Sequence, residues 1–241
     1  MIYKYYNNNE NFEHFACGRV IHGKAGFTNY PVRIAGEVFK RCLEYSNKKD
    51  GITIYDPCCG GGYLLTVLGL LNPDIIKNIY GSDISNEAIS LARENLSLLT
   101  FEGLLKRKQQ INDLIAKFNK QSHKDALKSV EVFLNIIKNR KIPPQIHCFI
   151  ADILDKKPLE EQDFKTDILI TDVPYGNLVS WSGESDNTIN QLLDNVIPVL
   201  HKNTILAIST DKGQKIKNDL FVRHEKLKIG KRVIYILQLK E

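Results

Sequence analysis

The 241-residue sequence lacks three features: a secretion-type leader, an apolar run of membrane length and any paired-cysteine spacing. The longest apolar stretch, residues 63–71, is about half as long as a membrane helix must be. The five cysteines form no C-x-x-C pair, and an odd number without a leader is typical of reduced thiols. We therefore expect a cytoplasmic protein that contacts no membrane and holds no metal.

Extreme composition is also absent. An apolar share of 43% is ordinary for a globular protein and argues against disorder or a fibrous repeat. The length suits one domain spanning residues 1–241, and no internal repeat is visible. A net charge of +5 is only a weak sign of an anionic partner, because many soluble proteins are mildly basic.

Strand patterns alternate with helix patterns along the chain. The β-branched runs at residues 52–54 and 168–170 are typical of buried parallel strands. Further strands are expected near residues 78–81, 146–150 and 204–209, and helices over residues 32–42, 63–71, 86–99 and 188–200. Two alternating segments, residues 220–227 and 233–239, predict a closing hairpin. The pattern predicts an α/β fold whose mostly parallel sheet has an antiparallel edge.

Residues 100–145 separate two consecutive predicted strands, a span too long for a loop without structure. Apolar residues at helical spacing predict a helical insertion of two helices, with Ser122 and Asp125 as a capping box between them. From residue 100 to 141 the insertion carries ten Lys or Arg against four Asp or Glu. Two interpretations stay open: a solvated helix surface, or one that faces nucleic acid. Residues 1–50 are interpreted as an N-terminal extension and helix.

Three glycines at residues 60–62 follow the first strand and precede a helix, where they allow a sharp turn and close approach of a ligand. A dinucleotide loop would need a further glycine where the chain has Leu65. Asp56, Asp83 and Asp152 each close a predicted strand. Asp83 is placed to accept hydrogen bonds from two ribose hydroxyls, and Asp152 from an adenine amino group.

Residues 56–62 resemble motif I of class I S-adenosylmethionine-dependent methyltransferases, and Asp83 matches their ribose-binding acid. The resemblance implies a Rossmann-like, seven-stranded fold with S-adenosyl-L-methionine as the cofactor. It also implies that Asp56 lies near the methionine part of the cofactor. The cofactor-binding residues that we expect are Arg33, Asp56, Cys58, Gly60, Gly62, Asp83, Ile84, Asp152 and Ile153.

The segment Asp172-Val173-Pro174-Tyr175 resembles the [D/N]-P-P-[Y/F] motif of amino-methyltransferases. A carboxylate and a carbonyl can accept both hydrogens of an amino group, and an aromatic ring can stack on a flat substrate. The resemblance implies that Asp172 orients the nitrogen and accepts its proton, that the carbonyl of Val173 is a second acceptor, and that Tyr175 stacks. Asp172, Pro174 and Tyr175 are the predicted catalytic residues, while Val173 departs from the usual proline of the motif.

A narrower resemblance joins residues 55–71, 27–33 and 172–176. Together they are similar to the AviRa-like family of avilamycin-resistance ribosomal RNA methyltransferases. That family implies methylation of a guanine base nitrogen in large-subunit (23S) ribosomal RNA, with the RNA or a ribosome precursor as partner and antibiotic resistance as a consequence. An amino-methyltransferase acting on DNA or a protein amide, and a non-catalytic RNA-binding module that retains the fold, remain alternatives. We expect a monomer.

Overall fold

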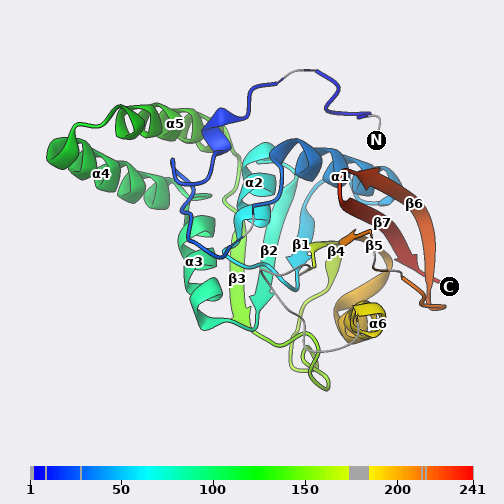
Figure 1. Ribbon diagram of the computed structural model, residues 1–241. Helices are drawn as coiled ribbons and strands as arrows, with labels where there is room; N and C mark the ends of the chain where they lie inside the picture. The colour runs from blue at the N-terminus through cyan, green and yellow to red at the C-terminus, as the bar shows by residue number, and fades with distance from the viewer. Residues whose placement is uncertain are drawn as a thin grey trace.

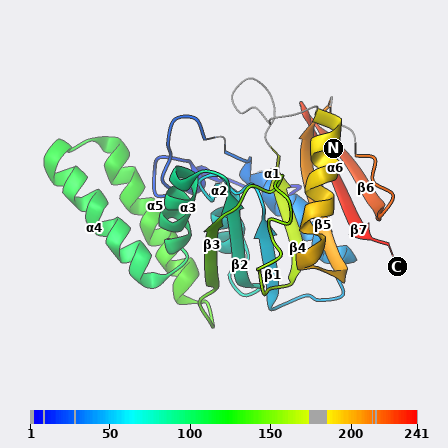
Figure 2. The same ribbon diagram turned by 90° about the horizontal axis from the view of Figure 1, so that it is seen from below.

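The computed structural model describes residues 3–8, 10–27, 29–173, 185–212, 214 and 216–240. A seven-stranded sheet in the order β3-β2-β1-β4-β5-β7-β6 forms its centre, with helices on both faces (Figures 1 and 2). The strands are β1 (Ile52–Asp56), β2 (Ile76–Asp83), β3 (Gln145–Ile150), β4 (Thr166–Asp172), β5 (Leu200–Asp211), β6 (Phe221–Ile229) and β7 (Arg232–Leu239). The helices are α1 (Val32–Tyr45), α2 (Tyr63–Leu71), α3 (Asn86–Ser97), α4 (Phe101–Phe118), α5 (Gln121–Lys138) and α6 (Ser185–Val196), with short 3₁₀ helices at Glu13–Phe15 and Ile197–Val199.

Strands β3, β2, β1, β4 and β5 run parallel, whereas β7 pairs antiparallel with β5 and β6. The predicted fold class is therefore confirmed, including the antiparallel hairpin at the carboxyl end. Because β1 lies between β2 and β4, the carboxyl ends of these three strands meet at one edge of the sheet. Ligands of open α/β sheets bind at this edge.

The two faces of the sheet bury separate hydrophobic cores. Strand β4 supplies both, because Ile168 and Ile170 pack on one face while Leu169 packs on the other. Helices α1, α2 and α3 contribute to the first core, and α6 covers the second. Successive side chains of a strand point to opposite faces of the sheet. Because both faces are buried here, residues 168–170 form a continuous apolar run in the sequence.

Helices α4 and α5 form a hairpin that projects from one end of the sheet (Figure 1). Two helices were predicted between residues 100 and 145, but the predicted capping box at Ser122 and Asp125 is wrong. Asn119, with φ of 48°, ends α4 and turns the chain so tightly that α5 already begins at Gln121. Asp125 then lies within the helix and accepts hydrogen bonds from Gln121 and Lys128.

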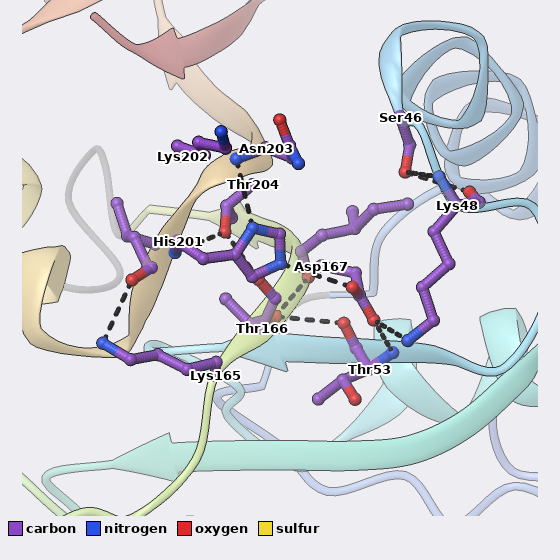
Figure 3. A network of polar contacts seen from close by, with 12 residues as sticks. Ser46, Lys48, Thr53, Lys165, Thr166, Asp167, His201, Lys202, Asn203 and Thr204 are labelled. Atoms are coloured by element: carbon purple, nitrogen blue, oxygen red, sulfur yellow. Dashed lines mark hydrogen bonds and ion pairs between the residues drawn. The ribbon is translucent and has the colours of Figure 1, made fainter. Parts of the chain in front are cut away.

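At the amino ends of the strands, opposite the ligand side, Asp167 links neighbouring elements. Its side chain is buried at the start of β4 (Figure 3). One carboxylate oxygen accepts hydrogen bonds from the Thr53 backbone N–H and the Lys48 ammonium, both at 2.7 Å. The other lies 3.3 Å from Nε2 of His201 in β5. The strand register shifts beside this carboxylate in both β1 and β4, which interrupts the regular backbone hydrogen bonding between strands. Asp167 accepts hydrogen bonds from polar groups that would otherwise be unpaired there.

Among the described residues, no helix combines the length and the apolar character needed to cross a lipid bilayer.

Candidate active site

A cavity of about 380 Å³ opens at the carboxyl ends of β1, β2 and β4. Seven of the residues given a role from the sequence line this cavity: Asp56, Cys58, Gly60, Asp83, Ile84, Asp172 and Val173. They come from three strand ends that are far apart in the sequence. The fold therefore brings the glycine loop and the start of the predicted substrate loop to one cavity.

The glycine loop is shaped by contact with α3. Gly62 has φ of 72°, and a Cβ built there would lie 2.9 Å from the backbone Cα of Ala92. A Cβ at Gly61 would lie 2.6 Å from Leu91. These glycines therefore allow α2 to begin close against α3, which leaves the backbone of Gly60 and Gly61 at the cavity wall.

Asp83, the last residue of β2, is held by two backbone N–H groups. Its Oδ2 accepts a hydrogen bond of 3.0 Å from Gly60, and its Oδ1 accepts one of 2.9 Å from Ser85. A carboxylate has about four lone-pair sites, so both oxygens retain capacity for a ligand in the cavity. Beside it, the side chain of Ile84 is 64% exposed, which gives this part of the wall an apolar surface.

Asp56, the last residue of β1, is almost fully buried at 2% exposure. Burial raises its pKa from 3.8 to about 7, and the neighbouring carboxylates of Asp83 and Asp172 add to this rise. A hydrogen bond of 3.0 Å from the Cys58 backbone N–H opposes it. Burial also raises the pKa of the Cys58 and Cys59 thiols, so these groups stay protonated and are poor nucleophiles.

Asp172, the last residue of β4, forms an ion pair with Arg232 of β7. Its Oδ2 lies 3.2 Å from Nη2 of Arg232, and its Oδ1 lies 3.4 Å from Nε. Burial raises the pKa of Asp172, while Arg232 acts in the opposite direction. Val173 then donates a backbone hydrogen bond of 3.0 Å to Ser209 of β5, which fixes the direction in which the chain leaves the strand.

The remaining predicted catalytic residues, Pro174 and Tyr175, lie outside the described residues. Their predicted roles stay predictions.

The other predicted cofactor residues do not line this cavity. Gly62 acts through the packing described above. Asp152 accepts a hydrogen bond from Leu154, and Ile153 is 5% exposed in the core beneath α6. Arg33 donates from Nε to the Tyr6 carbonyl at 2.7 Å, and its guanidinium lies 4.0 Å from the ring centroid of Tyr3. Cofactor binding by Arg33, Asp152 and Ile153 stays a prediction.

The segment before α1 forms a wall of the cavity, a role that the sequence had not indicated although residues 27–33 belong to the family resemblance. His22, Phe27 and Tyr30 belong to this wall. Asn95 of α3, only 1% exposed, exchanges hydrogen bonds with the backbone of His22 and donates another to the Gly61 carbonyl. An asparagine on the buried stripe of an amphipathic helix was the available signal.

The parallel sheet, the glycine loop after β1 and the acid closing β2 together define a class I methyltransferase fold. The sequence profile of the family described as rRNA methyltransferase AviRa matches residues 1–232. The protein belongs to the AviRa family.

Individual relatives agree with this assignment. The 23S rRNA (guanine(2535)-N(1))-methyltransferase of Streptomyces viridochromogenes is 33% identical over 222 residues, which cover 90% of this chain and 88% of the relative. A solved structure of rRNA methyltransferase AviRa from the same organism has a TM-score of 0.89 and 29% identity, covering 99% of this chain and 96% of the other.

A more distant solved structure, a putative class I S-adenosylmethionine-dependent methyltransferase from Listeria monocytogenes, has a TM-score of 0.53 and 15% identity. It covers 91% of this chain and 63% of its own, and shows likeness of fold alone.

Proposed function

We propose that this protein transfers a methyl group from S-adenosylmethionine to N1 of a guanine in 23S ribosomal RNA. The observation that carries the proposal is the shared cavity: Asp83 and the glycine loop form one part of it, and Asp172 reaches it from the neighbouring strand. Membership in the AviRa family and the named activity of the Streptomyces relative support the choice of substrate.

The residues of the cavity fit the cofactor. Its volume of about 380 Å³ lies in the usual range for small-molecule sites, roughly 300–1,000 Å³. Asp83, oriented by two backbone N–H groups, would accept the ribose hydroxyls, and the exposed side chain of Ile84 would lie against the adenine ring. The cofactor's methionine part would extend past Gly60 toward Asp56. When bound, S-adenosylmethionine supplies an electrophilic methyl group.

The Watson–Crick edge of guanine is complementary to a carboxylate. The N1–H and N2 amino donors of guanine lie side by side on this edge, and Asp172 can accept hydrogen bonds from them. The sequence had suggested an exocyclic amino group, whereas N1 is a ring nitrogen that must lose its proton. We infer that Asp172 receives this proton and passes it to solvent. The N1–C bond forms as the S–C bond breaks, and the electron pair of that bond stays on sulfur.

The target guanine must be unpaired when it is methylated, because pairing hides N1 within the double helix. Enzymes that modify such an atom act on single-stranded or flipped-out nucleotides and stack the base on an aromatic side chain. The predicted roles of the Val173 carbonyl as a second acceptor and of Tyr175 as the stacking ring agree with this requirement. We further infer that the protein acts in the cytoplasm, as a monomer, on ribosomal RNA or a ribosome precursor.

The decisive experiment is transfer of a radiolabelled methyl group to 23S rRNA, with matched DNA and protein fractions in parallel. A methyl group on guanine N1 blocks Watson–Crick pairing, so reverse transcription should stop at the modified nucleotide. Asp172→Ala should lose transfer while retaining cofactor binding. Label that enters only DNA or protein, or RNA label without a transcription stop, would contradict the proposal. An inert wild-type protein that still binds the RNA would favour the non-catalytic alternative.

A further inference from the structure

Arg232 reaches the active site from an element to which the sequence had assigned no role. It is the first residue of β7, which follows β5 in the sheet, while Asp172 closes β4 on the other side of β5. The register pairs Asp172 with Ser209 and Asp211 with Arg232. The arginine side chain therefore passes over the end of β5 to meet Asp172 with two nitrogens, at 3.2 and 3.4 Å.

Arg232 is also held from a second side. Its guanidinium carbon lies 5.3 Å from the ring centroid of Tyr30, within the range of a cation–π contact. Tyr30 is itself fixed, since it is only 4% exposed and its hydroxyl lies 2.7 Å from Oγ of Ser209. A guanidinium fixed between a carboxylate and an aromatic face loses little further freedom when a substrate binds.

The charges around Asp172 come from several elements. Asp56 of β1 is close enough that Asp172 raises the pKa of the Asp56 carboxyl. Strand β5 contributes Asp211, which pairs in register with Arg232, and the segment before α1 contributes the phenol of Tyr30. Burial thus raises the pKa of Asp172 and disfavours its charged form, and Arg232 acts against burial.

We infer that Arg232 is a positioning residue for methyl transfer, which keeps Asp172 ionised and aimed so that the carboxylate can accept the guanine N1 proton. This inference rests on the proposed function. The chemical reason is that a protonated Asp172 has one proton too many to act as the acceptor. Arg232 would therefore act through Asp172 and not by contact with the cofactor, because it is not among the residues that line the cavity.

The test compares Arg232→Met and Arg232→Lys with wild type, with Lys231→Met as a control from the exposed turn of the same hairpin. The rate constant kcat/KM for RNA is measured from pH 5.5 to 9. An arginine beside an aspartate typically lowers its pKa by about 1–3 units, so Arg232→Met should move the acid limb of the profile upward by about that amount. Arg232→Lys should move it less, and Lys231→Met not at all.

A purely structural role predicts a different result. The rate would then fall by the same factor at every pH, the acid limb would stay in place, and the inference would be overturned. The KM for S-adenosylmethionine should remain at its wild-type value in both Arg232 variants. If Arg232→Met fails to fold, Arg232→Lys still tests the inference through its smaller upward shift of the acid limb, because an ammonium keeps the charge but lacks the two-pronged geometry.

A second measurement separates this inference from the proposed function. Carboxyl-carbon NMR of the free protein follows the titration of Asp172 without any turnover. A wild-type protein that methylates rRNA, with an Asp172 titration and rate profile unmoved by the Arg232 variants, overturns the inference alone. A wild-type protein that transfers no methyl group to RNA overturns the proposed function, and the role of Arg232 in transfer falls with it even if the Asp172 titration moves.

Discussion

Replacing Asp56 by asparagine should change the pH dependence of folding in a direction opposite to that of most acidic residues. Most carboxylates in folded proteins have lowered pKa values and stabilise the fold above them. Asp56 has a raised pKa because it is 2% exposed and faces other carboxylates. The contribution of Asp56 to the free energy of unfolding is therefore fully present below pH 3.8 and is lost as the pH rises through about 7.

The size of the effect follows from the shift. Each pKa unit corresponds to about 1.4 kcal/mol, so the rise from 3.8 to about 7 amounts to about 4 kcal/mol. Roughly 2–3 kcal/mol of that loss falls between pH 5 and pH 8. Asparagine cannot ionise and escapes the loss. The free energy of unfolding of Asp56→Asn, relative to wild type, should therefore improve by roughly 2–3 kcal/mol between these two pH values.

Urea unfolding followed by far-UV circular dichroism at pH 5 and pH 8 measures this double difference. Titrating groups that do not interact with Asp56 cancel between the two proteins. Asp50→Asn, an exposed carboxylate just before the same strand, serves as the control. A double difference near zero would refute the reasoning, since Asp56 would then ionise in the fold as it does in the unfolded chain. A difference of opposite sign would mean that a counter-charge holds Asp56 ionised.

The other predictions concern the cofactor, the base and the RNA. Asp83→Ala should weaken S-adenosylmethionine binding in calorimetry by about 10- to 100-fold, because charged hydrogen bonds contribute about 1.5–3 kcal/mol; an unchanged affinity contradicts the ribose assignment. Tyr175→Ala should lower kcat/KM for RNA by about 10- to 100-fold through lost stacking, while the Kd for the cofactor stays put; equal losses in both count against stacking. Lys117→Glu with Lys120→Glu, at the tip of the α4–α5 hairpin beside an exposed aromatic ring, should weaken RNA binding and reduce its salt slope by about 1–2, whereas Lys77→Glu, an exposed residue at the start of β2, should not; equal slopes in all three proteins would leave the hairpin as a solvated surface.

The sequence predicted most accurately the strands that are buried on both faces of the sheet. Strands β1 and β4 are buried on both faces, and the short apolar or β-branched runs at their centres, residues 52–55 and 168–170, therefore stand out in the sequence. The start of α5 was harder to place, because it depends on the left-handed conformation of Asn119 and not on the polar residues that follow. The wall around His22 and Tyr30 has no periodicity and is held by contacts with distant helices and strands, such as those made by Asn95.

The ten Lys or Arg residues counted in the insertion overstate the positive charge that is free at its surface. Arg107 donates hydrogen bonds to the carbonyls of Arg19 and Val20. Arg140 donates to three carbonyls, including those of Gly69 at the end of α2 and Leu99 after α3. Both guanidinium groups satisfy backbone oxygens that helix ends and loops leave unpaired. Reversing the charge of Arg107 would therefore test folding, which is why the tip lysines are the sharper probes of RNA binding.

Asp56 and Asp172, which both line the cavity, differ in whether a positive charge lies beside them. Asp172 forms an ion pair with Arg232, which opposes the effect of burial on the pKa of Asp172. The pKa of Asp56 is raised by burial and further by Asp83 and Asp172. A ligand bearing a positive sulfonium would favour the ionised form of Asp56, and by linkage its affinity should rise as the pH passes through about 7. Saturating S-adenosylmethionine should then shrink the double difference between Asp56→Asn and wild type, whereas S-adenosylhomocysteine, which lacks the sulfonium charge, should leave it nearly intact. Equal effects of the two ligands would show that Asp56 does not sense the sulfonium charge, which is lost when the methyl group is transferred.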